Sequence, residues 1–323
     1  MSGVSRLLIT DRAWPDSQIE RGILEPLGIE VIEAPSGDES TLCELARGAQ
    51  AIACNWAKVT RRVIEAAPGL RIVSRMGIGL DNIDIPTATA RGIPVTNVPD
   101  YCVAEVADHA LGLLLAAARR IAFFHLRTKR GEYQLSAPAP PERLAGKTLG
   151  LVGLGRIAQN LAPKARALGL HVVAHTPSGS DRGLGCPMLS LPELLARADY
   201  VSLHLPATPQ TRHLFRLPQF EQMRRTAWLI NTSRGALVHE ADLHTALQRQ
   251  LLAGACLDVF DPEPPDLAQP LFADERVIVT PHAAFVSPES LIELRQRVAR
   301  QVADRLTGRQ PENIVNPAYA NPR

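Results

Sequence analysis

The stretch Thr148–Leu168 constrains the fold of this chain more than any other part of the sequence. It opens with an apolar run, Thr148–Val152, that suits a buried parallel strand. Gly153, Gly155 and Ala158 then follow in the pattern Gly-x-Gly-x-x-Ala, and apolar residues continue at helical spacing to the end of the stretch. A strand, a glycine turn and a helix in this order are the context in which the pattern binds a dinucleotide.

Each small residue of this motif has a physical role. Gly153 permits the tight turn, Gly155 lets the backbone approach a pyrophosphate, and Ala158 lets the helix pack close to the strand. The pyrophosphate is expected at the helix N-terminus, where unpaired amides and the helix dipole favour negative charge. Arg156 and Ile157, which begin the helix, are therefore also predicted to lie against the cofactor.

The composition excludes several other classes of protein. The length of 323 residues favours two domains, and a net charge of +2 gives no electrostatic case for nucleic acid or membrane binding. The five cysteines are scattered without a C-x-x-C pair, which predicts reduced core thiols in a cytoplasmic protein and no metal site. The apolar run Leu7–Thr10 is too short for a signal peptide, and charged residues interrupt the apolar helix near Ala104–Ala118.

Short apolar runs alternate with amphipathic segments on both sides of the motif, which indicates parallel sheets with helices on both faces. We expect strands near 6–10, 29–33, 51–54, 70–74 and 94–97 before the motif, and near 171–175, 200–203, 228–231, 255–258 and 277–280 after it. Asp100–Phe124 is predicted to form one long helix, and Ser287–Leu306 the final one. The proline-rich segment Gly131–Gly146 is predicted to be a loop.

Three polar side chains follow three of the later strands. Arg234 follows the strand near 228–231, Glu263 follows the strand near 255–258, and His282 follows the strand near 277–280. Open α/β sheets bind ligands at such strand ends. A guanidinium can hold a carboxylate by two parallel hydrogen bonds, and a histidine beside a carboxylate can act as a general acid–base. These are the groups that reduction of a 2-keto acid by a nicotinamide hydride requires.

The segments Gly153–Ala158, Asn231–Gly235, Asp258–Pro265 and Thr280–Ala284 resemble the D-isomer-specific 2-hydroxyacid dehydrogenases. The resemblance implies a Rossmann cofactor domain, residues 101–285, inserted into a flavodoxin-like substrate domain formed by residues 1–100 and 286–323. The expected fold is therefore α/β, with two doubly wound parallel-sheet domains. The cofactor is NAD(H) or NADP(H), and the substrate is a small 2-keto or D-2-hydroxy acid.

The resemblance also implies a role for each site residue. Arg234 would bind the substrate carboxylate and keto oxygen, His282 would exchange the proton, and Glu263 would orient His282. The backbone of Gly77, Ile78 and Gly79 would hold the substrate carboxylate. Asp258 would face the nicotinamide carboxamide. The remaining residues expected near the cofactor are Val106, His175, Thr176, Pro206, Thr211, Thr232, Ser233, His282 and Ala284.

Subfamily signals are mixed. Val98–Cys102, Glu105–His109 and Pro281–Phe285 are similar to the C-terminal-binding-protein branch, in which members act as dinucleotide-sensing corepressors. Phosphoglycerate dehydrogenases are also similar, but their phosphate-binding arginine is replaced here by Asn55 and Trp56, which argues against a phosphorylated substrate. Formate dehydrogenases carry a glutamine in place of Glu263. The leading hypothesis is an oxidoreductase, and the alternative is a regulatory dinucleotide-binding protein.

The cofactor preference stays open at this point. NAD-specific members place an acidic residue after the second strand of the cofactor domain, where it binds the ribose 2′-hydroxyl. Thr176 takes that position here, so no carboxylate would repel a 2′-phosphate, yet the first arginine beyond it is Arg182. Family members associate through their cofactor domains, so the apolar Asp100–Phe124 helix further suggests a homodimer.

Overall fold

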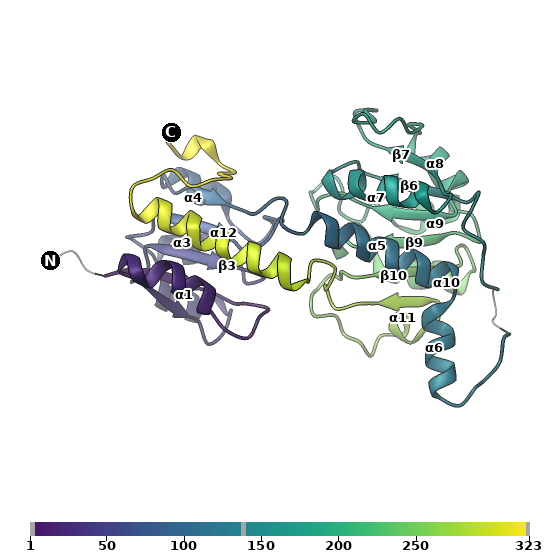
Figure 1. Ribbon diagram of the computed structural model, residues 1–323, viewed down its shortest axis with the longest axis horizontal. Coiled ribbons are helices and arrows are strands. Elements are labelled where there is room, and N and C mark those ends of the chain that lie inside the picture. Colours follow the sequence, from purple (N-terminus) through teal and green to yellow (C-terminus); the bar gives the residue numbers. More distant parts are fainter. Residues whose placement is uncertain (1–3, 137–139, 321–323) are drawn as a thin grey trace. The chain divides into compact units, whose positions relative to one another are not determined.

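The computed structural model describes residues 4–136 and 140–320. Its internal contacts divide the chain into a first unit, Met1–Tyr101 with Ser287–Arg323, and a second unit, Cys102–Val286 (Figure 1). The second unit therefore interrupts the first along the sequence. Each unit is built on its own parallel sheet.

The first unit has a five-stranded sheet in the order β2-β1-β3-β4-β5. The strands are β1 (Ser5–Ile9), β2 (Ile29–Glu33), β3 (Ala51–Cys54), β4 (Ile72–Arg75) and β5 (Val95–Thr96). The helices are α1 (Gln18–Leu24), α2 (Glu39–Ala46), α3 (Arg61–Glu65), α4 (Ile85–Ala90) and α12 (Pro288–Leu306), with short 3-10 turns at Glu25–Leu27 and Pro317–Ala320. All neighbouring strands pair in parallel, and β3 and β4 are buried throughout, as strands covered on both faces must be.

The second unit has a six-stranded parallel sheet in the order β11-β10-β9-β8-β6-β7. The strands are β6 (Thr148–Val152), β7 (His171–His175), β8 (Tyr200–Leu203), β9 (Trp228–Asn231), β10 (Gly254–Leu257) and β11 (Val277–Val279). The helices are α5 (Val103–Ala118), α6 (Ile121–Lys129), α7 (Arg156–Ala167), α8 (Leu191–Arg197), α9 (Leu217–Gln222), α10 (Glu240–Gln248) and α11 (Pro270–Ala273), with a 3-10 turn at Gly235–Leu237.

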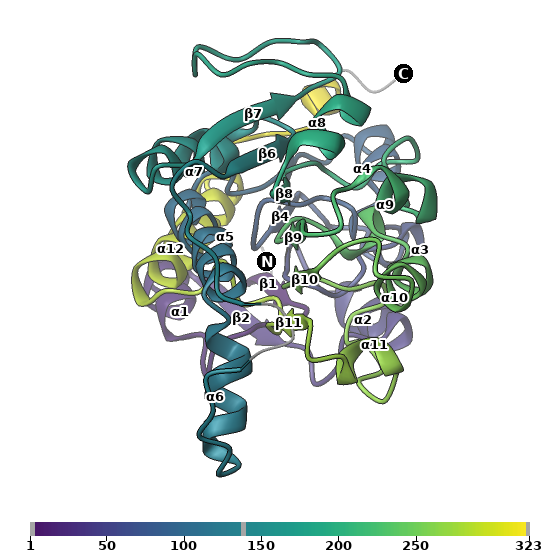
Figure 2. The ribbon, with the colours of Figure 1, turned by 90° about the vertical axis from the view of Figure 1, so that its right-hand side faces the viewer.

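Both sheets are doubly wound, which confirms the predicted fold class. In the second unit the chain runs from β6 to β7 on one side and then continues from β8 to β11 on the other (Figure 2). The order therefore reverses between β6 and β8. Ligands of open α/β sheets bind at such a switch point, beyond the carboxyl ends of the strands.

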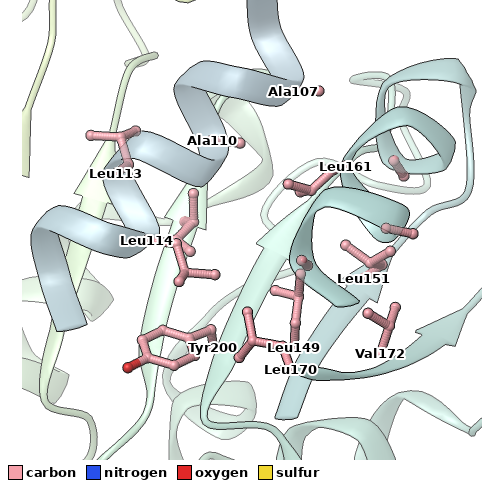
Figure 3. Close-up of a cluster of buried hydrophobic side chains, with 14 of the residues drawn as sticks. Ala107, Ala110, Leu113, Leu114, Leu149, Leu151, Leu161, Leu170, Val172 and Tyr200 are labelled. Atoms are coloured by element: carbon pink, nitrogen blue, oxygen red, sulfur yellow. The ribbon is translucent and has the colours of Figure 1, made fainter. Parts of the chain in front are cut away.

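One apolar cluster fixes the glycine motif in the second unit. Ala107, Ala110 and Leu114 of α5 pack toward Leu149 and Leu151 of β6, and Leu161 of α7 joins the same cluster (Figure 3). The small side chains on α5 allow the close contact between α5 and α7 that places the α7 N-terminus beside β6.

The prediction of one helix over Asp100–Phe124 is wrong. α5 ends at Ala118, α6 begins at Ile121, and the two axes differ by 66°. The break lies at Arg120, whose φ of 55° is left-handed, and whose guanidinium carbon lies 4.6 Å from the ring centroid of Trp228. A left-handed residue cannot continue a right-handed helix, and the cation–π contact holds it there.

No single helix within residues 4–136 and 140–320 is long and apolar enough to cross a membrane, although the bent pair α5–α6 passes that test by length and composition. The segment after α6 is irregular as predicted wherever it is described, and residues 137–139 lie outside the described residues.

A buried ion pair joins the two ends of the first unit. Arg295 of α12 donates from Nε and a terminal nitrogen to the carboxylate of Glu20 on α1, at 2.9 and 2.8 Å. Glu20 is fully buried, and the guanidinium carbon of Arg295 lies 5.4 Å from the ring centroid of Trp14. This contact ties the C-terminal helix to the N-terminal segment.

Candidate functional site

The glycine motif forms a cradle at the carboxyl end of β6. Gly153 has a φ of 95°, and a Cβ there would lie 2.3 Å from the carbonyl oxygen of His204, so only glycine fits. Gly155 caps the N-terminus of α7 without a side-chain hydrogen bond, and the space where its Cβ would lie is open for 4 Å. Arg156 and Ile157 form the first turn beyond it. A helix N-terminus that begins at a glycine with open space beside it fits the pyrophosphate of a dinucleotide.

An orphaned hydroxyl at the end of β9 also fits a bound cofactor. Thr232 is buried, and its Oγ1 has no hydrogen-bond partner within the described residues. Its neighbour Ser233 is engaged, since its Oγ donates to the carbonyl of Leu203 at 2.6 Å. A buried hydroxyl without a partner is costly, and a ligand that pairs with Thr232 would remove that cost.

The end of β7 carries neutral side chains. His175 Nδ1 donates to the Leu189 carbonyl at 3.0 Å, and Thr176 Oγ1 lies 3.4 Å from Ser178 Oγ. The nearest following carboxylate, Asp181, accepts the amides of Gly183 and Gly185 at 3.0 and 3.1 Å. The Asp181 carboxylate therefore stabilises a local turn by accepting these two amides.

Two further residues predicted to contact the cofactor, Thr211 and Val106, each donate a hydrogen bond to a backbone carbonyl. Thr211 Oγ1 donates to the carbonyl of Pro206 at 2.7 Å, which closes the turn after β8. Val106 is buried in the first turn of α5, and its amide donates to the Cys102 carbonyl at 3.0 Å.

A histidine–carboxylate pair joins the loops that follow β10 and β11. Nδ1 of His282 lies 2.7 Å from Oε2 of Glu263. Oε1 of Glu263 accepts the Phe260 amide at 2.9 Å. Burial opposes ionisation of Glu263, but the hydrogen bond and charge of His282, the Phe260 amide and the charge of Arg234 together hold the pKa of Glu263 below its ordinary value. Because Nδ1 contacts the carboxylate, Nε2 is the ring nitrogen on the side away from Glu263.

Arg234 reaches the same loops through a close backbone contact. It precedes Gly235, where a Cβ would lie 1.9 Å from the carbonyl carbon of Phe260. Only glycine allows the loop after β9 to touch the loop that carries Glu263. Asn231 Nδ2 donates to the Arg234 carbonyl at 2.8 Å, which fixes the backbone from the strand side. The structure thus brings Arg234, Glu263 and His282 together at neighbouring strand ends.

The buried carboxylate of Asp258 accepts hydrogen bonds from the loop that contains His282. Its carboxylate accepts the Ala283 amide at 2.8 Å, the Ala284 amide at 3.0 Å and the Thr280 hydroxyl at 2.5 Å. Its own carbonyl accepts the His282 amide at 2.8 Å, and its side chain is fully buried. The carboxylate thus holds the backbone on both sides of His282, whose φ is 52°.

The loop predicted to bind the substrate carboxylate lies after β4 in the first unit. The Gly77 amide donates to the Arg75 carbonyl at 2.9 Å, and Asn97 Nδ2 donates to the Ile78 carbonyl at 2.8 Å. Gly77 has a φ of 150°, and a Cβ there would lie 2.8 Å from a guanidinium nitrogen of Arg75. These contacts fix the backbone of the loop at Gly77 and Ile78.

Sequence reasoning gave no role to two polar side chains near this site. His109 of α5 and Thr280 are 171 positions apart, yet His109 Nε2 lies 3.0 Å from Thr280 Oγ1. Thr280 could have been suspected because it follows β11 two residues before His282. The sequence marks His109 only as the end of the segment Glu105–His109 that resembles one branch of the family, which gives it no individual role.

The fold and these strand-end residues together define a dinucleotide-binding α/β protein with a histidine–carboxylate pair beyond the carboxyl ends of its strands. The profile described as "D-isomer specific 2-hydroxyacid dehydrogenase, NAD binding domain" matches residues 111–284. The chain belongs to the D-isomer-specific 2-hydroxyacid dehydrogenase family.

Two curated relatives illustrate the range of the family. The chain is 38% identical over 316 residues to a D-3-phosphoglycerate dehydrogenase of Methanocaldococcus jannaschii, covering 96% of this chain and 59% of that protein. It is 40% identical over 269 residues to a glyoxylate reductase of Korarchaeum cryptofilum, covering 80% of each. The chain therefore spans less than two thirds of the length of the first relative and four fifths of the second.

Solved structures show the same fold over nearly the whole chain. The NADPH-dependent glyoxylate/hydroxypyruvate reductase of Sinorhizobium meliloti, solved with NADP and malonate, matches with a TM-score of 0.88 at 30% identity, covering 98% of both chains. The D-lactate dehydrogenase of Aquifex aeolicus, solved with NAD and lactic acid, matches with a TM-score of 0.86 at 26% identity, covering 97% of this chain and 99% of that one.

Proposed function

We propose that this protein transfers a hydride between a nicotinamide dinucleotide and a small 2-keto or D-2-hydroxy acid. The observation that carries the proposal is the 2.7 Å contact between His282 Nδ1 and Glu263 Oε2, at the same sheet edge as the Gly153–Gly155 cradle. Arg234, whose charge acts on Glu263, lies on the adjacent loop.

Each site residue has a distinct task in this proposal. Arg234 binds the substrate carboxylate and keto oxygen through its guanidinium, which offers donors in a fixed planar fork. For the loop Gly77–Gly79 we keep the role that the family resemblance implies, backbone binding of a substrate carboxylate. His282 delivers a proton from Nε2 to the keto oxygen as negative charge develops there, and Glu263 stabilises the protonated ring. Bound reduced nicotinamide supplies the hydride.

The residues proposed to hold the cofactor surround the switch point. The α7 N-terminus with Gly153, Gly155, Arg156 and Ile157 takes the pyrophosphate, and Thr232 supplies its unpartnered hydroxyl. The other proposed contacts are Val106, His175, Thr176, Pro206, Thr211, Ser233, Asp258, His282 and Ala284. Since no free carboxylate follows β7, we propose that the site accepts both NAD(H) and NADP(H).

The first unit favours a substrate without a phosphate. After β3 the chain places Asn55, buried, and Trp56, 43% exposed, where a phosphate-binding arginine would stand. Both residues are neutral, so neither offers a charge to a phosphate. We therefore propose an unphosphorylated acid such as glyoxylate or hydroxypyruvate, the substrates named for the similar reductases.

A substrate panel tests the proposed function. Oxidation of NADH and NADPH is followed by absorbance with glyoxylate, hydroxypyruvate, pyruvate, phenylpyruvate and 3-phosphohydroxypyruvate. We expect turnover of at least one unphosphorylated acid, and a rise in KM together with a fall in kcat for Arg234→Lys. If NADH binds but no acid turns over, the regulatory binding protein becomes the better reading.

We further propose a homodimer in the cytoplasm. Ile121 and Leu126 of α6 are 55% and 51% exposed, and Tyr133 and Leu135 beyond it are 94% and 96% exposed, an apolar set that a second copy would cover. Burial raises the pKa of the Cys54 thiol to about 12, as suits an inert reduced thiol. Light scattering at micromolar concentration is expected to give twice the chain mass, and a monomer mass would contradict the dimer.

A further inference from the structure

We propose that His109, on α5, is a positioning residue for His282 and acts through Thr280 and Asp258. The proposal rests on the proposed function, in which His282 exchanges the proton. His109 lies outside the residues that would touch substrate or cofactor, so its effect must pass through the loop that carries His282.

The contacts form a continuous chain within the second unit. His109 Nε2 lies 3.0 Å from Thr280 Oγ1 and 3.6 Å from Asp258 Oδ1. Thr280 Oγ1 lies 2.5 Å from the same Oδ1. Asp258 then holds the amides of Ala283 and Ala284, which directly follow His282.

The direction of these hydrogen bonds follows from proton counting. A threonine hydroxyl has one proton, and a carboxylate oxygen at 2.5 Å must receive it, because two oxygens without a proton between them would repel at that distance. Thr280 can then only accept from His109. The Nε2 atom of His109 therefore carries a proton and donates it to Thr280.

The consequence is a fixed orientation of the buried carboxylate. A fully buried carboxylate is sensitive to the loss of any donor, since no water replaces it. His109 stands on a helix that is anchored by the buried neighbours Ala107 and Ala110. It therefore transmits the rigid position of α5 to Thr280, and through Asp258 to the His282 loop.

The hydrogen bonds to Asp258 matter because His282 has a left-handed backbone conformation. His282 has a φ of 52°, a conformation that few residues other than glycine adopt without support from their surroundings. The amide of His282 and the two amides after it all end on Asp258. If the carboxylate rotates, the loop loses the contacts that hold this conformation, and Nε2 moves relative to the keto oxygen.

Four variants test this series of hydrogen bonds from His109 to the His282 loop. His109→Phe keeps a ring but removes the donor, whereas His109→Gln keeps a donor near the Nε2 position. Thr280→Val removes the hydroxyl, and Thr280→Ser keeps it. We expect His109→Phe and Thr280→Val to lower kcat for the preferred keto acid about tenfold or more, since small displacements of a catalytic group are costly. NADH affinity, measured by fluorescence, should change less than kcat does, because most of the proposed cofactor contacts lie outside this loop.

Recovery of kcat in the conservative variants, together with a non-additive loss in the double variant, distinguishes a positioning role from a general loss of structure. His109→Gln and Thr280→Ser should recover most of the lost kcat, and the double variant H109F/T280V should lose no more than Thr280→Val alone. Wild-type kcat in His109→Phe, equal losses in His109→Gln and His109→Phe, or losses that multiply in the double variant would each overturn the proposal.

A second readout does not depend on turnover. Hydrogen exchange of the amides of Ala283 and Ala284 should be faster in His109→Phe than in the wild type and near normal in His109→Gln. If the wild type turns over no keto acid, the proposed function fails, and this exchange still decides whether His109 holds the loop. Unchanged exchange in His109→Phe would overturn the positioning role.

Discussion

Glu263 accepts a hydrogen bond from each side of its carboxylate, and one of these comes from His282 Nδ1 at 2.7 Å. The pKa of Glu263 lies below its ordinary value despite burial, because His282, the Phe260 amide and Arg234 favour the ionised form. The hydrogen bond thus holds the His282 ring with Nδ1 toward an ionised carboxylate.

The first prediction concerns Glu263→Gln, which removes the charge and keeps the shape. The pKa of Glu263 is lowered, so the wild type carries an ionised carboxylate beside the ring that would deliver the proton. Loss of this charge should lower kcat for reduction of a keto acid by about tenfold or more. The measurement is kcat for reduction at neutral pH with the preferred keto acid.

Glu263→Asp provides the matched control, since it keeps the charge and shortens the side chain. It should lower kcat less than Glu263→Gln does, because the charge stays near the His282 ring. Equal kcat values for the wild type and Glu263→Gln would remove Glu263 from the proton transfer.

The second prediction separates two glycines by what surrounds them. Gly235→Ala would place a Cβ 1.9 Å from a backbone carbon of Phe260, which cannot move aside as a side chain can. We expect a loss of several kcal/mol of stability or failure to fold. Gly155→Ala meets open space, so it should fold with a nearly normal melting temperature but bind NADH at least tenfold more weakly, because the Cβ occupies the proposed pyrophosphate position. Normal NADH affinity in a folded Gly155→Ala would argue against that position.

Much of this site follows from local sequence, and some of it does not. The strand, turn and helix around Gly153 are predictable because apolar periodicity and two glycines specify them within one short stretch. The break at Arg120 is not predictable, because it depends on a contact with the distant Trp228. Neither is the need for glycine at position 235, because the clash is with Phe260 of another loop.

The third prediction concerns the buried ion pair of the first unit. Glu20→Ala leaves Arg295 buried without its bidentate partner and should destabilise the protein by about 3–5 kcal/mol. The control is Glu30→Ala, which breaks the exposed pair with Arg6 and should cost less than about 1 kcal/mol. Thermal unfolding followed by circular dichroism compares the two, and equal changes in melting temperature would contradict the prediction.

The fourth prediction is an acid dependence of stability that arises from His204. Burial lowers the pKa of His204 from 6.5 to about 4, while its Nε2 lies 2.9 Å from Ser202 Oγ. Between these values the unfolded chain binds the proton and the folded chain does not, so stability falls as the pH falls from 6.5 to 4 and is no longer affected by this group below that. The loss should be on the order of 3 kcal/mol.

His204→Gln retains a hydrogen-bonding group that does not titrate, so its stability should depend less on pH in that range. Urea unfolding at neutral pH and at mildly acidic pH measures the difference. A wild type and a His204→Gln variant that lose equal stability would show that His204 does not cause the dependence.

The last prediction concerns cofactor choice at the end of β7. Thr176 is neutral, and Asp181 is engaged by the amides of Gly183 and Gly185, so the wild type should use both NADH and NADPH. Thr176→Asp would place a carboxylate where it can accept the ribose 2′-hydroxyl of NADH and repel a 2′-phosphate. We expect kcat/KM for NADPH to fall at least tenfold while that for NADH stays within a few-fold. Thr176→Asn has a similar size without the charge and should leave the ratio of the two kcat/KM values near that of the wild type. If Thr176→Asp leaves that ratio unchanged, the 2′-position of the cofactor does not lie beside Thr176.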